Sequence, residues 1–167
     1  MQPEQMIALA LEAAEEGMML GEMPIGAVVL QGDEVVGRAY TQERTLRRHI
    51  VHADLMAMLE ADASLGFRKS TQRLTLAVNL EPCLMCIGAA MTLGVDRVLF
   101  GLESPDDGGV ELLDHWNPAA ELPFFRRPEI TGGYFRAEVK DQFARFAALE
   151  SAPEGMRRWA LGMAGLP

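Results

Sequence analysis

Cysteine is scarce in this sequence of 167 residues: only Cys83 and Cys86 occur, three positions apart. A small secreted domain that depends on disulfides needs several cysteines at wider spacing, so a disulfide framework is excluded. Two interpretations of the pair remain: part of a metal site, or a redox-active dithiol. The spacing alone does not separate them.

Long apolar runs are also missing, since no stretch approaches the roughly 20 residues that cross a bilayer. The first 20 residues contain four acidic residues and no Lys or Arg, whereas a secretory signal peptide begins with positive charge. We therefore expect a soluble, cytoplasmic protein. Its length is sufficient for one domain with a substantial core.

Basic residues are too few to suggest a nucleic-acid-binding surface. The chain has 15 Lys and Arg against 24 Asp and Glu, which gives a net charge of −9. Affinity for nucleic acid depends mainly on basic side chains that contact phosphates. The densest basic clusters are Arg44, Arg47 and Arg48, and then Arg126 and Arg127. RNA and DNA are disfavoured as partners, although a tRNA is not excluded.

Hydrophobic periodicity predicts alternating helices and strands. The predicted helices cover residues 4–20, 52–63, 83–93, 137–149 and 154–161, and the predicted strands cover residues 24–30, 34–40, 74–80, 95–100 and 129–135. The first two strands form a hairpin, and the strand–helix–strand segment between 74 and 100 predicts a parallel pair. We expect one α/β domain over residues 1–167, with a helical extension from about residue 150.

Two details of this pattern can be tested directly. The helix over 52–63 is predicted to bury an apolar stripe made of Leu55, Met56, Leu59 and Ala63. The polar segment over 41–51 is predicted to be a loop without regular structure.

The candidate chemistry lies at two predicted helix N-termini, those at His52 and Cys83. The positive end of a helix dipole lowers the pKa of a cysteine there. Two thiolates and one imidazole suit a tetrahedral Zn²⁺ ion whose fourth position stays open to water. The other histidines, His49 and His115, would supply a fourth ligand only if the fold brought them close.

The joint pattern resembles the cytidine-deaminase-like superfamily, in particular the branch of bacterial tRNA adenosine deaminases and guanine deaminases. The matching segments are residues 24–29, 51–57, 79–86 and 101–109. This resemblance implies a three-layer α/β/α sandwich with a mixed five-stranded sheet, and a homodimer. It also implies a hydrolytic deaminase whose Zn²⁺ is held by His52, Cys83 and Cys86. Further substrate contacts are predicted at Ala53, Glu81 and Pro82.

One catalytic position departs from the family. The family's proton shuttle is a Glu two residues after the zinc-binding His, whereas this chain has Asp54. The shorter side chain withdraws the carboxylate by about 1.5 Å, and a general base must lie within about 2.6–3.2 Å of its proton. Asp54 acts alone on a helix closer to the metal, or a loop acid (Glu103, Asp106 or Asp107) assists, or the chain is a weak or inactive homologue. We favour Asp54, because the other motif residues are present.

The substrate positions depart from the tRNA adenosine deaminases as well. An Asn that helps to bind the base in those enzymes is matched by Thr41, and the segment before the zinc-binding His differs over residues 48–51. Together with the negative charge, this favours a free nucleobase, nucleoside or related heterocycle, with a tRNA adenosine-to-inosine deaminase as the alternative. Trp116 is predicted to stack on the ring, and Phe124, Phe125 and Tyr134 are further candidates.

Two other classes of function stay open at this point. A non-catalytic zinc scaffold would bind zinc and release no ammonia from any base. A thiol redox protein would bind no zinc and would form a titratable disulfide between Cys83 and Cys86.

Overall fold

A computed structural model describes residues 1–67, 70, 72–117 and 126–167. Their strands form one mixed sheet of five strands, as the resemblance implied, in the order β2-β1-β3-β4-β5. β1 (Gly26–Gln31) pairs antiparallel with β2 (Glu34–Tyr40) and with β3 (Leu74–Leu80). β4 (Arg97–Leu102) pairs parallel with β3 and with β5 (Glu129–Thr131).

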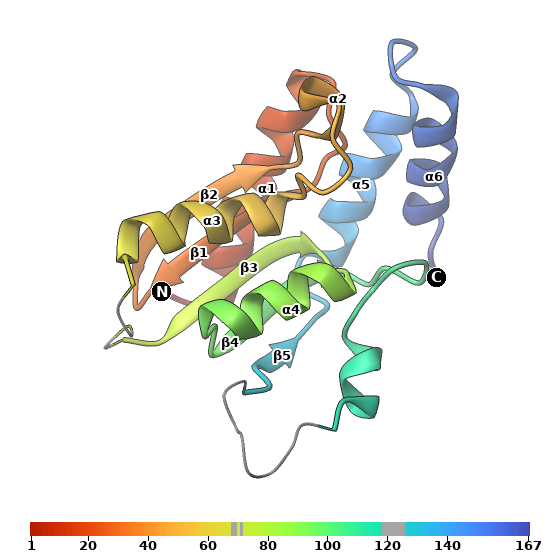
Figure 1. Cartoon of the computed structure of the whole chain (residues 1–167). Helices are drawn as coiled ribbons and strands as arrows, with labels where there is room; N and C mark the ends of the chain where they lie inside the picture. Colours follow the sequence, from red (N-terminus) through yellow and green to blue (C-terminus); the bar gives the residue numbers. More distant parts are fainter. Residues whose placement is uncertain (68–69, 71, 118–125) are drawn as a thin grey trace.

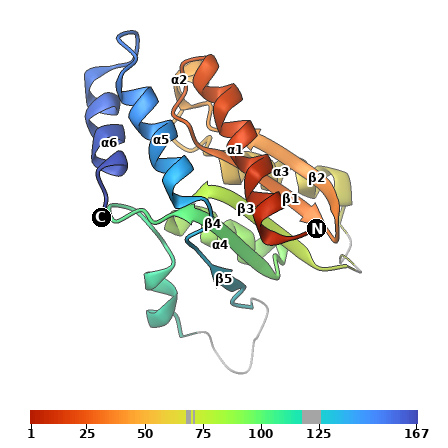
Figure 2. The same cartoon turned by 180° about the vertical axis from the view of Figure 1, so that it is seen from behind.

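Helices cover both faces of this sheet and produce the predicted three layers (Figure 1). α3 (Ala53–Leu65) and α4 (Leu84–Leu93) lie on one face. α1 (Pro3–Met19) and α5 (Arg136–Ala147) lie on the other face, which Figure 2 turns toward the viewer. α6 (Glu154–Ala164) packs against the outer side of α5.

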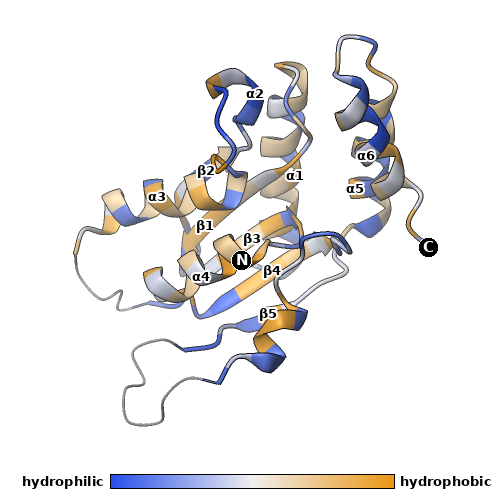
Figure 3. Cartoon of the chain, turned by 45° about the vertical axis from the view of Figure 1, so that its right-hand side comes forward, coloured by the Kyte–Doolittle hydropathy of each residue, from blue (hydrophilic) through white to orange (hydrophobic). Residues whose placement is uncertain are grey.

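The sheet is buried on both faces, which explains the hydrophobic character of its central strands (Figure 3). Along β1, Ala27 and Val29 pack into the cluster beneath α3 and α4. The alternate residues, Val28 and Leu30, pack into the cluster beneath α1. Side chains alternate between faces along a strand, so a strand covered on both sides must be apolar at every position.

Two segments depart most from the predicted elements, while the bounds of the others differ by no more than three residues. The segment over 41–51 contains a short helix, α2 (Glu43–Leu46), where only a loop was expected. The last strand ends at Thr131 and not at 135, because Gly132 and Gly133 follow it and Phe135 already serves as the N-cap of α5. A 3-10 helix, η1 (Glu111–His115), lies after β4.

The predicted apolar stripe of α3 is wrong. Leu59 is 55% exposed and Ala63 is exposed, while Leu55 and Met56 are only partly buried. The buried face carries instead small residues, Ala53, Ala57 and Ala61, together with Asp54 and Met58.

The buried face of α3 carries small residues because this helix lies very close to β2. A Cβ atom at Gly37 of β2 would lie 2.1 Å from the Ala57 carbonyl oxygen and 2.9 Å from the Ala61 nitrogen. The helix backbone therefore rests on the strand where neither side supplies a large side chain. Because large residues do not fit there, hydrophobic periodicity misidentified the buried face.

None of the described helices combines the length and the apolar character that crossing a bilayer requires.

Candidate active site

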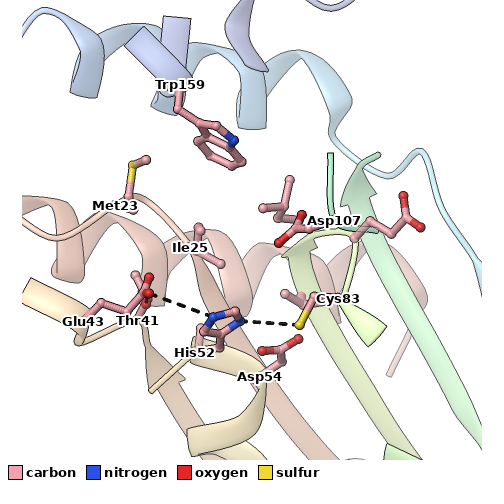
Figure 4. A pocket seen from close by; sticks show the side chains of 13 residues that line it. Met23, Ile25, Thr41, Glu43, His52, Asp54, Cys83, Asp107 and Trp159 are labelled. Carbon is pink, nitrogen blue, oxygen red and sulfur yellow. Dashed lines mark hydrogen bonds and ion pairs between the residues drawn. The ribbon is translucent and has the colours of Figure 1, made fainter. Parts of the chain in front are cut away.

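Three side chains, those of His52, Cys83 and Cys86, converge at one end of the sheet, in front of the N-termini of α3 and α4. Figure 4 shows two of them, His52 and Cys83. His52 Nδ1 lies 3.6 Å from the Cys83 sulfur and 3.9 Å from the Cys86 sulfur. All three ligand atoms lie within 4.8 Å of one another. Segments that are 31 residues apart in the sequence are thus brought to a single point.

Local backbone structure explains this placement. His52 is the N-cap residue of α3 and Cys83 is the N-cap residue of α4, both with extended backbone angles. Cys86 lies in the first turn of α4 and its side chain is fully buried. The predicted positions at helix N-termini are confirmed, so both ligand segments place their side chains in the positive field of a helix end.

The donor set fits a zinc ion. Zinc binds sulfur at about 2.3 Å and nitrogen at about 2.0–2.1 Å, so tetrahedral geometry requires an N–S separation of about 3.6 Å. The observed separations from His52 to Cys83 and Cys86 are 3.6 Å and 3.9 Å. Three protein ligands are typical of a catalytic zinc site, which keeps its fourth position for water or substrate.

Shared protons perturb the pKa of each ligand. The hydrogen bond from Cys86, and after it the one from His52, lowers the pKa of Cys83 to about 4. The hydrogen bond to Cys83 raises the pKa of His52 to about 9. The same thiolate, together with burial, raises the pKa of Cys86. Cys83 therefore carries the negative charge of the cluster, and a metal ion must displace protons from its two neighbours.

Asp54 lies beside this cluster, on the first turn of α3. Its side chain is only 4% exposed, and one carboxylate oxygen accepts the backbone N–H of Leu55 at 3.0 Å. Burial raises the pKa of Asp54, against a lowering contribution from the Cys86 thiol. A buried carboxylate next to three metal ligands matches the position that the sequence predicts for a proton shuttle.

A cavity of about 190 Å³ opens onto the cluster. Its wall includes Thr41, Ala53 and Glu81 of the predicted substrate contacts, together with the ligands His52 and Cys83. The remaining lining residues are Met23, Ile25, Glu43, Asp54, Val78, Leu80, Asp107 and Trp159. Pockets that bind drug-sized ligands have volumes of about 300–1,000 Å³. The smaller volume of this cavity suits a single heterocycle.

The predicted contact Glu81 has its carboxylate engaged by the backbone. One oxygen accepts the N–H of Ser104 at 3.0 Å and the other accepts the N–H of Val110 at 3.1 Å. Gly108 lies so close that a Cβ atom there would meet this carboxylate at 2.5 Å. Glu81 therefore holds the loop after β4 against the segment that carries Cys83 and Cys86. Pro82 is buried and does not line the cavity, although its carbonyl accepts the N–H of Gly109 at 2.8 Å.

The three loop acids differ in their surroundings. Glu103 pairs with Arg136, which holds the pKa of that carboxyl below its usual value. Asp106 accepts the indole N–H of Trp159 at 3.1 Å. Asp107 lines the cavity, and its carboxylate accepts the Ser104 hydroxyl at 2.6 Å. Of these three acids, only Asp107 lines the cavity together with Asp54, so it is the one placed to assist Asp54.

The aromatic wall of the cavity is a residue that the sequence did not single out. Trp159 of α6 lies across the cavity from His52 and Cys83 (Figure 4). Trp116 ends η1 and is not among the lining residues, so its predicted stacking role has no support from this placement. The amphipathic pattern of α6 could have indicated that this helix packs against the domain. Periodicity does not reveal where a helix packs, so it could not place Trp159 at the cavity.

The other candidates lie elsewhere. Tyr134 packs against the core beneath α1, on the face opposite α3. Phe124 and Phe125 fall outside the described residues. His49 and His115 are exposed and do not join the ligand cluster, so neither completes a four-ligand structural site here.

Comparison with known proteins agrees with this geometry. The family profile described as "Cytidine and deoxycytidylate deaminase zinc-binding region" matches residues 1–102. The chain belongs to this zinc-dependent deaminase family. The tRNA-specific adenosine deaminase of Bacillus subtilis (strain 168) is 34% identical over 148 residues, which cover 87% of this chain and 88% of that protein.

Solved structures extend the comparison to the fold. A structure from a study of A-to-I editing by tRNA:A34 deaminases superposes with a TM-score of 0.70 at 27% identity, covering 83% of this chain and 98% of that one. Guanine deaminase from Nitrosomonas europaea superposes with a TM-score of 0.66 at 22% identity, covering 84% of each chain. At the latter identity, the likeness concerns the fold alone.

Proposed function

We propose that this protein hydrolyses the 6-amino group of adenosine in a tRNA, producing inosine and ammonia. The observation that supports it most directly is the convergence of His52, Cys83 and Cys86 beside the buried carboxylate of Asp54. The tRNA substrate class is supported by the adenosine deaminase relatives, which match most of the chain. The relatives thus favour the alternative that composition alone had disfavoured.

The metal ligands and Asp54 have defined tasks in this proposal. His52, Cys83 and Cys86 would hold a zinc ion, which would supply Lewis-acid activation of water when bound. Asp54 takes the proton of the attacking water, passes it to the ring nitrogen and returns a proton to the departing ammonia. Burial raises the pKa of Asp54, so its carboxyl holds a proton more readily than that of an exposed Asp.

The remaining walls would hold the base. Thr41 is buried with its hydroxyl 3.3 Å from the Val51 carbonyl and 3.3 Å from a Glu43 oxygen, and it lines the cavity as a polar contact for the ring. Ala53 leaves room beside the metal ligands, and Trp159 offers a flat face for stacking. A cavity of this size admits one base, so an adenosine within RNA must leave its stack to enter.

The decisive experiment compares substrates with zinc-loaded protein. A tRNA with adenosine at the wobble position, a tRNA with guanosine there, free adenosine, adenine, guanine and cytidine are each assayed for ammonia, and inosine in the tRNA is identified after nuclease digestion. We expect ammonia and inosine from the first tRNA and none from its guanosine counterpart. Turnover of free bases alone would contradict the tRNA assignment.

A free purine base is the second candidate. The small cavity walled by Trp159, and the net charge of −9, both favour a compact substrate without a phosphate backbone. The same panel identifies this case by ammonia from adenine or guanine but not from tRNA. Zinc binding without ammonia from any member of the panel would indicate an inactive homologue. The homodimer and the cytoplasmic location stay predictions.

A further inference from the structure

We propose that Glu43 is a positioning residue for the zinc ligand His52. Nδ1 of His52 faces both sulfurs, at 3.6 Å and 3.9 Å. Its other ring nitrogen, Nε2, points away from the metal site and lies 4.0 Å from Glu43 Oε1 (Figure 4). Glu43 therefore stands behind the ligand, at the nitrogen that the metal does not use.

A buried anchor holds Glu43 in this place. Glu22 is fully buried, and its two carboxylate oxygens accept the backbone N–H groups of Thr45 at 2.6 Å and Arg44 at 3.1 Å. These N–H groups belong to the first turn of α2, so Glu22 satisfies donors that a helix start leaves free. Glu43 is the first residue of that helix. Part of the segment that was predicted as an irregular loop is therefore a short helix, α2, held in place by Glu22.

A second contact restricts the Glu43 side chain itself. The Thr41 hydroxyl lies 3.3 Å from Glu43 Oε2, while Oε1 is the oxygen nearest His52. The two carboxylate oxygens therefore have different partners. This orientation presents an acceptor to His52 from the side opposite the sulfurs.

The physical consequence concerns the imidazole tautomer. Metal-ligating histidines donate their second ring N–H to a carboxylate or carbonyl, which fixes the ring and keeps the other nitrogen free to bind the metal. With Glu43 as the acceptor, the proton of neutral His52 stays on Nε2 and the Nδ1 lone pair faces the zinc. The 4.0 Å between Glu43 Oε1 and His52 Nε2 exceeds hydrogen-bond distance, so a rotation of the partly exposed Glu43 side chain must bring the two atoms together.

Zinc affinity tests this role without any substrate. Glu43→Ala removes the acceptor, whereas Glu43→Gln keeps an oxygen that accepts the same N–H. Glu150→Ala, in the exposed segment before α6, is the matched loss of one acidic residue. Zinc-loaded proteins are titrated with a competing chelator, and circular dichroism checks the fold of each variant.

We expect Glu43→Ala to weaken zinc binding by about 10- to 100-fold, and Glu43→Gln to stay within about threefold of the Glu150→Ala control. Nitrogen-15 spectra of the imidazole should show the proton on Nε2 in the wild type and in Glu43→Gln. Equal zinc affinity in Glu43→Ala and the control overturns the proposal, and so does equal weakening in Glu43→Ala and Glu43→Gln. The inference rests on the zinc site of the proposed function, but chelator titration is independent of turnover, so the two can fail separately.

Discussion

Trp159 donates its indole N–H to Asp106 at 3.1 Å, and this contact joins α6 to the loop after β4. The indole also meets the Phe143 ring edge-on, with ring centroids 5.6 Å apart and an interplanar angle of 76°. Two elements, α5 and the loop after β4, therefore hold one aromatic side chain in the cavity wall. The last helix contributes directly to the site, although it follows the cysteine ligands by many residues in the chain.

The two tryptophans give a matched test of the cavity wall. Trp159→Ala should raise KM by roughly 10-fold or more, because stacking of a base on an aromatic side chain contributes about 1–3 kcal/mol. Trp116→Ala should leave KM within about twofold, since Trp116 does not line the cavity. Steady-state kinetics on the preferred substrate measures both. A larger effect from Trp116 than from Trp159 would favour the assignment made from the sequence.

Asp54 can be separated from the metal ligands by mutation. Asp54→Asn keeps the size of the side chain but cannot accept and return a proton, so kcat should fall by about 10²- to 10⁴-fold. Zinc content should stay at the wild-type level, because the ligand cluster does not include Asp54. Asp62→Asn, an exposed acid on the same helix, is the control. Full turnover in Asp54→Asn would contradict the role of Asp54 and would favour Asp107 as the proton shuttle.

Zinc uptake should release two protons near pH 7. The pKa of His52 is raised to about 9 and the pKa of Cys86 is also raised, so both carry a proton before the metal binds. The pKa of Cys83 is lowered to about 4, so that thiolate has none to lose. Calorimetric titrations of metal-free protein with zinc, in buffers of different ionisation enthalpy, count the protons. Zinc affinity should fall as the pH falls, because protons then compete for His52 and Cys86; release of no protons would contradict this proton sharing.

The contact between α3 and β2 gives a prediction about stability. Gly37→Ala would place a Cβ atom 2.1 Å from the Ala57 carbonyl oxygen, so the helix must shift and the free energy of unfolding should fall by about 1–3 kcal/mol. Gly88→Ala, inside α4 with open space around it, should instead stabilise the protein by about 0.4–1 kcal/mol. Urea unfolding measures both variants. Equal free energies of unfolding for the two variants would mean that α3 moves away from β2 without loss of stability, which would contradict this prediction.

Each half of the metal site could be found from the sequence because its arrangement is local, whereas the resemblance to a known family joined the two halves. His52 and Asp54 share the first turn of α3, while Cys83 and Cys86 share the first turn of α4. A helix start imposes its geometry within a few residues, so spacing alone places these side chains together in pairs. Alternating helices and strands likewise predicted one α/β domain, while the three layers were implied by the resemblance to a known family.

The partners of those ligands could not be predicted in the same way. Glu43 acts on a helix too short to produce a periodic signal, and the buried carboxylate of Glu22 anchors that helix from another segment. Trp159, and not Trp116, reaches the cavity because α6 docks on Phe143 and Asp106. Contacts of this kind join residues that are far apart in the chain.

By itself, the sequence indicated the zinc ligands and the candidate shuttle through its resemblance to a known family, and it predicted the order of helices and strands through hydrophobic periodicity. Only the tertiary structure decided which acids and which aromatic face the cavity, and which side of α3 is buried. The physical reason is that close packing is collective: the buried face of α3 follows from the absence of a side chain at Gly37, not from the hydrophobicity of α3 itself.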